Sequence, residues 1–325
     1  MLTTGGTILS KKGKEGLVPI CSPEEILRRI PKLKVICDIE IKSIMNISSP
    51  NMQPEDWISI ARQILNAVND YDGIVLVHGT DTMAYTSSAL SFLVQGVQKP
   101  VVITGSQIPL FEVGTDAIKN MNDACFLACE DIAGVYVVFN GKIIKGCRAS
   151  KIGSGRLNAF ASINYPYIGM IFDKNIKYFH KPITNSRKIN SKYLAICPSV
   201  ILIKLVPGTT PDIFDILEDL KFKGIVIESF GKGGLPNRKN NMIQKVKEIV
   251  KRGIPVAVTT QCLFDGCDLT LYENGQQTLK SGAIPANDMT TEATVTKLMW
   301  ALGRYEDPIE IRRVMLTNYV DEISQ

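Results

Sequence analysis

Residues 73–83 constrain the fold most, because an apolar run ends there in a short polar turn. Residues 74–78 are typical of a buried parallel strand. Gly79 allows a tight turn, and Thr80 and Asp81 follow it directly. Small and apolar residues then recur at helical spacing. Ligands of open α/β sheets bind outside the carboxyl ends of the strands, so we interpret Thr80 and Asp81 as candidate site residues.

Apolar strands alternate with helical segments along the chain, which predicts an α/β fold with mostly parallel sheets and right-handed crossovers. The length of 325 residues favours two domains. We expect a larger N-terminal catalytic α/β domain over residues 1–180, whose parallel sheet is extended by a β-hairpin at Asn140 and Gly141. Residues 181–194 are predicted to be a linker, because this part of the chain is polar and lacks periodicity. Residues 195–325 then form a smaller α/β domain with a parallel sheet.

Several segments carry weaker patterns. Residues 10–16 are polar and interrupted by glycines, which predicts a mobile loop and a candidate lid over Thr7. Residues 34–41 are rich in β-forming side chains and predict a strand, whereas residues 158–167 predict irregular structure. The last helix that the pattern predicts spans residues 291–302. The first strand is shorter than average, so we expect the native chain to begin upstream of Met1.

Charge and composition exclude several classes of protein. The net charge of +5 is mild and no run of five or more basic residues is present, which argues against a nucleic-acid partner. No apolar stretch reaches the roughly 18–20 residues of a membrane span, and the first residues do not resemble a signal peptide. The eight cysteines include several in predicted core elements, which is typical of free thiols in a cytoplasmic protein. Cysteine spacing and only two histidines predict no metal site, and we expect no cofactor.

Hydroxyl side chains follow four strands of the first domain, at Thr7, Ser49, Thr80 and Ser106. Neighbouring parallel strands would bring most of them to one sheet edge. A carboxylate among hydroxyls suits a small zwitterion, with Asp81 facing an ammonium group and Ser49 with backbone N–H groups facing a carboxylate.

The same residues carry a candidate nucleophile. A threonine hydroxyl is weak until a base removes its proton. Lys151 follows the hairpin and is a candidate base that acts through Thr80, with Asp81 orienting it.

Each of these residues also has an ordinary structural interpretation. Thr7 and Asp81 are suited to cap a helix or turn, Ser49 precedes a proline turn, and Lys151 is of a type that usually lies on the solvated surface. His78 is interpreted as a buried, hydrogen-bonded strand residue, and Cys262 as a strand-end residue with a smaller chance of touching a ligand.

Two motifs in order resemble a known family. Thr-Gly-Gly-Thr-Ile at residues 4–8 and His-Gly-Thr-Asp-Thr-Met at residues 78–83 resemble the two signature motifs of the L-asparaginases. The resemblance to the family extends to residues 49–52, 104–107 and 148–151. Residues 228–233, 259–262 and 288–293 resemble the second domain of the bacterial type I, cytoplasmic branch. The two signatures together, with a lysine about seventy residues after the second, form a specific pattern.

The resemblance implies roles for individual residues. Thr7 would be the nucleophile that attacks the side-chain amide of L-asparagine and forms an acyl-enzyme, and Thr80, Asp81 and Lys151 would support it. Backbone N–H groups near Thr80 would serve as an oxyanion hole. The residues expected to surround the substrate are Gly6, Ser48, Ser49, Pro50, Gly79, Thr80, Asp81 and Ser106.

The sequence departs from the family pattern at two places. Many members carry a lid tyrosine, but no tyrosine occurs between Met1 and Asp70, and Leu17 occupies the comparable position. Pro50 replaces a residue that is often polar. The resemblance also implies a homodimer or homotetramer, and it makes Cys262 a candidate contact in a second, allosteric site.

Two other functions fit the same motifs. One is the ammonia-supplying amidase subunit of a tRNA-dependent amidotransferase, which would carry an additional N-terminal domain. The other is a non-catalytic regulator that binds asparagine. The sequence does not decide between asparagine and glutamine, because one methylene is discriminated by only ~1–3 kcal/mol.

Overall fold

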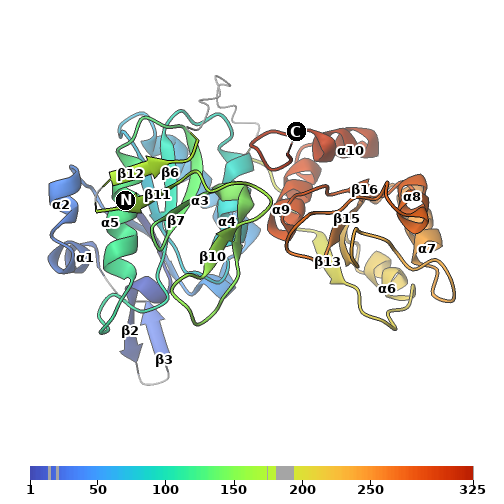
Figure 1. Ribbon diagram of the computed structural model, residues 1–325, viewed down its shortest axis with the longest axis horizontal. Coiled ribbons are helices and arrows are strands. Elements are labelled where there is room, and N and C mark those ends of the chain that lie inside the picture. Colours follow the sequence, from blue (N-terminus) through green and yellow to red (C-terminus); the bar gives the residue numbers. More distant parts are fainter. Residues whose placement is uncertain (14–15, 20–21, 174, 181–193, 325) are drawn as a thin grey trace. The chain divides into compact units, whose positions relative to one another are not determined.

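The computed structural model describes residues 1–13, 16–19, 22–173, 175–180 and 194–324 (Figure 1). The chain divides into two compact units, Met1–Leu194 and Ala195–Gln325. The predicted fold of two α/β domains is confirmed, with the larger sheet in the first unit. Residues 181–193 of the predicted linker lie outside the described residues, so the domain limits stay a prediction.

The N-terminal unit contains an eight-stranded sheet in the order β12-β11-β8-β7-β6-β5-β1-β4. The five strands β4, β1, β5, β6 and β7 pair in parallel. β7, β8, β11 and β12 pair in antiparallel fashion, so the expected hairpin at Asn140 and Gly141 extends the parallel sheet. The strands are β1 (Leu2–Gly5), β4 (Lys42–Ile47), β5 (Ile74–Val77), β6 (Pro100–Thr104), β7 (Gly134–Phe139), β8 (Lys142–Lys145), β11 (Gly169–Phe172) and β12 (Asn175–Tyr178).

Helices cover both faces of this sheet (Figure 1). Alternate strand residues such as Val75, Val102 and Val138 pack in one core cluster with Met121 and Cys125 of α5. α4 contacts β6 and β7, and it is buried on almost every side, as expected for a helix between the sheet and a further helix. The helices of this unit are α1 (Pro23–Arg29), α2 (Leu33–Ile36), α3 (Pro54–Ala67), α4 (Met83–Leu93) and α5 (Ala117–Ala128), with short 3₁₀ turns η1 (Thr7–Leu9), η2 (Ser49–Asn51) and η3 (Gly146–Arg148).

Three local predictions for this unit are wrong. The loop expected at residues 10–16 contributes to an antiparallel hairpin of β2 (Ser10–Gly13) and β3 (Gly16–Pro19), which projects from the body of the unit (Figure 1). Lysine and glycine are poor strand formers, so pairing with the partner strand decides the structure there. Residues 34–41 contain the end of α2 rather than a strand, because a short apolar run does not distinguish the two periodicities.

The third wrong prediction concerns residues 158–167, which were expected to be irregular. They contain β10 (Phe160–Ser162), which pairs antiparallel with β9 (Ala149–Lys151). This pairing matters for the site, because it fixes the backbone that carries Lys151 opposite Phe160.

The C-terminal unit contains a four-stranded parallel sheet in the order β13-β14-β15-β16. Its strands are β13 (Val200–Lys204), β14 (Gly224–Ser229), β15 (Val256–Thr260) and β16 (Ile284–Pro285). Its helices are α6 (Ile213–Asp219), α7 (Met242–Lys251), α8 (Glu273–Lys280), α9 (Thr291–Leu302) and α10 (Pro308–Leu316). The sequence pattern missed α8 and α10, and α10 shows that residues 291–302 are not the last helix.

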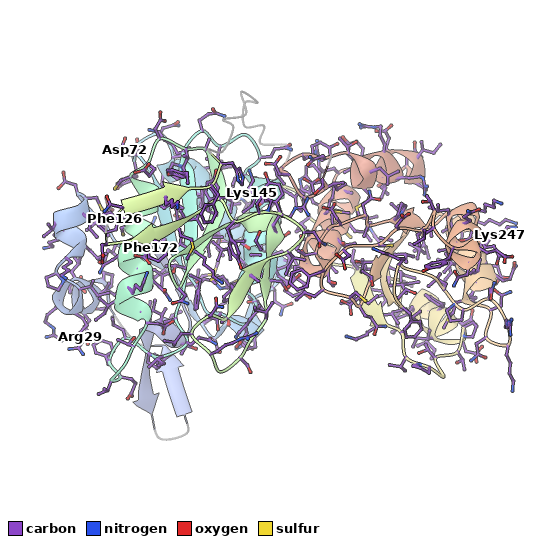
Figure 2. The ribbon with its side chains drawn as sticks, viewed as in Figure 1. Arg29, Asp72, Phe126, Lys145, Phe172 and Lys247 are labelled. Carbon is purple, nitrogen blue, oxygen red and sulfur yellow. The ribbon has the colours of Figure 1, made fainter. Side chains whose placement is uncertain are left out.

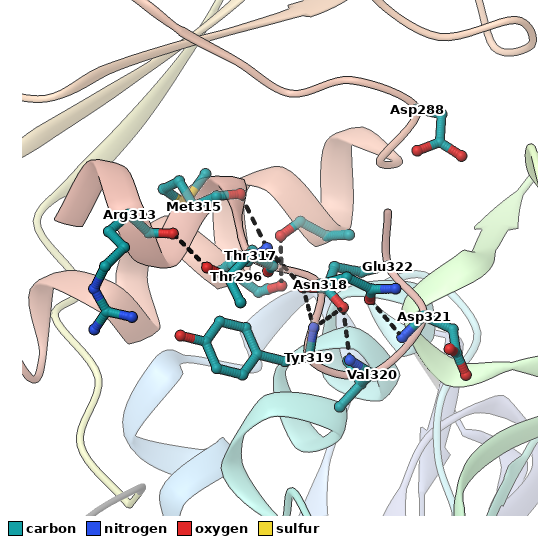
Figure 3. Close-up of polar contacts among 12 residues, drawn as sticks. Asp288, Thr296, Arg313, Met315, Thr317, Asn318, Tyr319, Val320, Asp321 and Glu322 are labelled. Carbon is teal, nitrogen blue, oxygen red and sulfur yellow. Dashed lines mark hydrogen bonds and ion pairs between the residues drawn. The ribbon is translucent and has the colours of Figure 1, made fainter. Parts of the chain in front are cut away.

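A buried ion pair holds the C-terminal tail against α9. Lys297 and Glu322 are both fully buried and lie 2.6 Å apart (Nζ to Oε1). The Lys297 ammonium also donates to the carbonyls of Met315 and Thr317, at 3.0 and 2.7 Å. The Glu322 carboxylate accepts from the backbone N–H groups of Tyr319 and Val320, which closes the tail into a compact turn (Figure 3).

The seven cysteines in the described part of the chain are free thiols, and Cys21 lies outside it. Within the described ranges, no helix is both long and apolar enough to cross a bilayer. The same residues contain no cluster of three or more histidine, cysteine or carboxylate side chains arranged to hold a metal ion.

We predict that Glu322→Gln strongly destabilises the C-terminal unit. Removing one partner of a buried pair leaves the Lys297 charge uncompensated, which costs ~3–5 kcal/mol. Urea unfolding measures this loss. The matched control is Glu310→Gln, which breaks the partly exposed pair with Arg313 and should cost only ~0–1 kcal/mol. Equal free energies of unfolding for the two variants would contradict the role of the buried pair.

Candidate functional site

Four neighbouring parallel strands, β4, β1, β5 and β6, end at the same edge of the N-terminal sheet. The segments that follow them carry the predicted hydroxyl side chains: Ser49 after β4, Thr7 after β1, Thr80 after β5 and Ser106 after β6. Strand adjacency therefore brings together residues that are far apart in the chain. This edge is the candidate site.

Two glycines let the central strands approach each other at this edge. A Cβ atom on Gly6 would lie 2.4 Å from the Cα of Gly79, and Gly6 has a φ of +81°. A Cβ atom on Gly79 would lie 2.6 Å from the Ser49 hydroxyl oxygen. Side chains at either position would clash with backbone or with Ser49. Thr7 and Thr80 are the residues that directly follow these two glycines in the chain.

Thr7 opens the 3₁₀ turn η1 and is partly exposed, whereas Ile8 and Leu9 are buried. The Gly6 carbonyl accepts from the Leu9 N–H at 3.1 Å and from the Ser10 hydroxyl at 2.8 Å. The backbone that carries Thr7 is therefore held on both sides by buried residues. Its side chain is left accessible to a ligand at the strand ends.

Thr80, Asp81 and Lys151 are in direct contact. The Lys151 ammonium nitrogen lies 2.9 Å from the Thr80 hydroxyl oxygen and 2.6 Å from Oδ1 of Asp81. The Thr80 residue is buried, while the Asp81 side chain is 57% exposed and that of Lys151 is 18% exposed. Lys151 is therefore not a solvated surface lysine. The carboxylate faces outward, where a charged ligand can reach it.

Ser49 is buried and bonded to the turn after β5. Its hydroxyl accepts from the Asp81 N–H at 3.2 Å, and its carbonyl accepts from the Thr82 hydroxyl at 2.8 Å. Because the Ser49 oxygen serves as an acceptor here, its own proton can be donated to a ligand. Ser48 and Pro50 flank it and are exposed.

Gln107 is a residue of this edge that the sequence reasoning missed. Thr80 donates its hydroxyl proton to the side-chain oxygen of Gln107 at 3.2 Å. The neighbouring Ser106 is buried, and its hydroxyl donates to the Ile108 carbonyl at 2.7 Å. The only sequence signal for Gln107 was its place in the same strand-end segment as Ser106, residues 104–107.

His78 is fully buried behind the Thr80 turn, as predicted. Its Nδ1 lies 2.7 Å from the Gly79 carbonyl, and its Nε2 lies 3.0 Å from the Thr86 hydroxyl, which accepts from Trp57 Nε1. This chain of bonds is satisfied by a neutral imidazole that donates from Nδ1 and accepts at Nε2. Burial lowers the pKa of His78 from 6.5 to about 4, and the bond to Gly79 opposes this shift only in part. The ring therefore holds the Gly79 carbonyl without adding charge to the site.

Two hollows lie elsewhere in the N-terminal unit. One, of about 840 Å³, is lined by residues of α2, α5 and the end of β11, including Phe126 and the exposed Phe172 (Figure 2). The other, of about 190 Å³, is lined by Met1, Glu40 and Tyr71 among others. The linings of the two hollows include none of the predicted site residues.

Cys262 lies in the C-terminal unit, just after β15, and is exposed. Its N–H donates to the Thr260 hydroxyl at 3.0 Å. The accessible thiol is compatible with a ligand contact.

Comparison with known proteins agrees with this geometry. Residues 1–184 match the family profile described as "Asparaginase, N-terminal", and residues 199–315 match "Glutaminase/Asparaginase C-terminal domain". The chain is 44% identical over 330 residues to an L-asparaginase of Thermococcus kodakarensis, covering 100% of this chain and 98% of that protein. It is 38% identical over 339 residues to a subunit of the Glutamyl-tRNA(Gln) amidotransferase of the same organism, covering 100% of this chain but 76% of that protein.

Solved structures are also similar over the whole chain. The thermostable L-asparaginase from Thermococcus kodakarensis has a TM-score of 0.92 at 43% identity, and the match covers 100% of this chain and 98% of that one. A probable cytoplasmic L-asparaginase from Campylobacter jejuni has a TM-score of 0.84 at 27% identity, with 98% of both chains covered.

We predict that His78 makes stability depend on pH between about 6.5 and 4. The unfolded chain binds a proton below its ordinary pKa of 6.5, while the buried ring stays neutral down to about 4, so folding stability falls as the pH drops through this window. The full loss corresponds to ~3 kcal/mol at ~1.36 kcal/mol per pKa unit. Urea unfolding of the wild type and of His78→Gln from pH 7 to 4 measures it. The variant should lose less stability across the window, and identical slopes would show that His78 is not responsible.

Proposed function

The chain belongs to the asparaginase family, and we propose that it hydrolyses L-asparagine to L-aspartate and ammonia at the strand-end site of its N-terminal unit. The observation that carries this proposal is the contact of Lys151 with both Thr80 and Asp81, beside the contact of Gly6 with Gly79, the residues that directly precede Thr7 and Thr80. These groups are suited to acyl transfer with a threonine nucleophile.

In the proposed reaction the Thr7 oxygen attacks the amide carbon of the substrate side chain. The tetrahedral intermediate expels ammonia and leaves an ester between Thr7 and the β-carboxyl group of aspartate. Water then attacks this ester, aspartate leaves, and the Thr7 hydroxyl is restored. Backbone N–H groups at the Thr80 turn are the proposed donors to the oxyanion, a role worth ~3–4 kcal/mol per donor in other acyl-transfer enzymes.

Thr80 and Lys151 are the proposed route for the protons that move in these steps. The Thr7 hydroxyl must lose a proton and the leaving nitrogen must gain one. Thr80 directly follows Gly79, which contacts Gly6. The Thr80 hydroxyl oxygen lies 2.9 Å from the Lys151 nitrogen. The sequence has no tyrosine between Met1 and Asp70. Thr80 therefore takes the place of a lid tyrosine as the first partner of the Thr7 hydroxyl in this proposal.

Asp81 and Ser49 are the proposed binding groups for the two charged ends of the substrate. Lys151 occupies Oδ1 of Asp81, so the other oxygen of this exposed carboxylate is placed to accept from the α-ammonium group. The Ser49 hydroxyl would donate to the α-carboxylate, together with backbone at Gly6, Ser48, Pro50 and Gly79. Opposite charges at a fixed separation select an amino acid over a simple amide.

Several finer properties remain part of this proposal. We place the enzyme in the cytoplasm, in keeping with the free thiols of the described residues, and we expect a homodimer or homotetramer of the type I branch. Cys262, exposed after β15, is our candidate contact for a second asparagine molecule with an allosteric effect.

The main rival is the ammonia-supplying subunit of a tRNA-dependent amidotransferase. Its support is the 38% identity to such a subunit in Thermococcus kodakarensis, of which this chain covers 76%. A stand-alone asparaginase differs from it in using free asparagine without tRNA. A non-catalytic asparagine-binding regulator would retain the binding groups without turnover.

We predict that the wild-type protein releases ammonia from free L-asparagine in the absence of tRNA, and that Thr7→Val abolishes this release. Valine preserves the shape of threonine but has no hydroxyl, so no acyl-enzyme can form. Coupled detection of ammonia measures the rate, and mass spectrometry of an acid-quenched reaction detects the aspartyl ester.

The control for folding is the thermal unfolding midpoint of Thr7→Val, which should match that of the wild type. Ammonia release only in the presence of aminoacylated tRNA would favour the amidotransferase function. Binding of asparagine without ammonia release, in wild type and variant alike, would favour the regulator.

We predict that Lys151→Met lowers kcat by ~10²–10⁴-fold, the usual contribution of proton transfer by a positioned side chain. Methionine fills a similar volume but cannot bond to Thr80 or Asp81. Binding of L-aspartate, measured by calorimetry, should remain within a few-fold, because Asp81 and Ser49 are still present. A loss of folding instead of turnover would show that the lysine is structural.

A further inference from the structure

We propose that Gln107 is a positioning residue of this site, whose side-chain oxygen fixes the direction in which the Thr80 hydroxyl points. The inference rests on the proposed function and assigns a role to a residue outside the nucleophile, the lysine and the binding groups. Gln107 does not touch the substrate in this scheme. It acts through Thr80.

The two ends of the Gln107 amide join two parts of the site. Its oxygen accepts from the Thr80 hydroxyl at 3.2 Å. Its nitrogen donates to the carbonyls of Arg156 and Gly153, at 3.3 and 3.5 Å. These carbonyls lie in the loop that joins β9, which ends at Lys151, to β10. One side chain therefore connects the Thr80 turn to the loop that follows the lysine.

The carbonyl acceptors of Arg156 and Gly153 also determine which end of the Gln107 amide faces Thr80. A backbone carbonyl can only accept, so the NH₂ group must face the loop and the oxygen must face the threonine. With its oxygen toward Thr80, Gln107 is an acceptor for the hydroxyl proton and cannot donate to it.

The backbone of Gln107 is held independently of its side chain. The Asp116 carboxylate accepts from the Gln107 N–H at 3.1 Å and from the Ile108 N–H at 3.0 Å. Asn120 donates to Asp116 at 3.0 Å and to the Gly105 carbonyl at 2.9 Å. A change of the Gln107 side chain therefore leaves the segment after β6 anchored. Its effect can be separated from a loss of folding.

These contacts determine which hydrogen bonds the Thr80 hydroxyl can make with the reactants. Its proton points to Gln107, and one of its two lone pairs accepts from Lys151 at 2.9 Å. The second lone pair remains to accept a hydrogen bond from Thr7 or from water. Without an acceptor at position 107, the hydroxyl proton is free to turn toward the nucleophile, where it would compete with the proton that must leave.

The test compares Gln107→Met and Gln107→Glu with the wild type. Methionine has a similar length but accepts no strong hydrogen bond, whereas glutamate keeps an oxygen that can accept from Thr80. We expect Gln107→Met to lower kcat for L-asparagine by ~10–100-fold, below the ~10²–10⁴-fold of a residue that transfers the proton itself. Its KM and the inhibition constant of L-aspartate should stay within about threefold. Gln107→Glu should recover part of the lost kcat.

The matched control is Gln98→Met, the same chemical change at an exposed glutamine before β6, whose amide donates to the Gly96 carbonyl. It should leave kcat and KM within about twofold, because it lies at the opposite end of the strand. The thermal unfolding midpoints of all variants are measured alongside.

The outcomes separate the two proposals. A kcat of Gln107→Met within twofold of the wild type, or a Gln107→Glu variant as slow as Gln107→Met, overturns the role of Gln107 while asparagine hydrolysis stands. A fall in unfolding midpoint that parallels the loss of rate also overturns it, because the residue would then be structural. A wild-type protein that does not hydrolyse asparagine refutes the proposed function and this inference with it.

Discussion

The close contact of Gly6 and Gly79 is the constraint on which the rest of the site depends. Adjacent parallel strands β1 and β5 end side by side, and the absence of a Cβ atom at both positions lets the two backbones touch. Ser49 follows β4, the strand on the other side of β1, and packs against Gly79. The hydroxyls of three separate segments are thus gathered by backbone geometry, and their positions do not rely on flexible side chains.

Thr80 lies beside one tight ion pair. Lys151 and Asp81 neutralise each other at 2.6 Å, and burial keeps His78 uncharged above a pKa of about 4. In the proposed function, the zwitterionic substrate would meet the outward Asp81 carboxylate and neutral hydrogen-bond donors. The Thr80 hydroxyl lies at the centre, between the lysine and the Gln107 amide, so its hydrogen-bonding state is set by neighbours from two other parts of the fold.

Local structure was predictable where the pattern was strong. The buried strand before Gly79 and the helix after it follow from the spacing of apolar residues. Prediction failed where pairing over a distance outweighs local preference, as in the hairpin of β2 and β3 and in the short strand β10. The prediction of a strand over residues 34–41 was wrong for a different reason. The apolar run is short, and a short run fits a helical turn as well as it fits a strand.

By itself the sequence determined the strand-turn-helix units, their order and the small residues at the turns, because these depend on neighbours along the chain. The tertiary structure alone decided which hydroxyls meet. Lys151 reaches Thr80 only because β9 is held by β10, and Gln107 rather than Ser106 bonds to Thr80 because the Ser106 hydroxyl turns back to the Ile108 carbonyl. Such contacts join residues many positions apart and depend on side-chain direction, which no local pattern encodes.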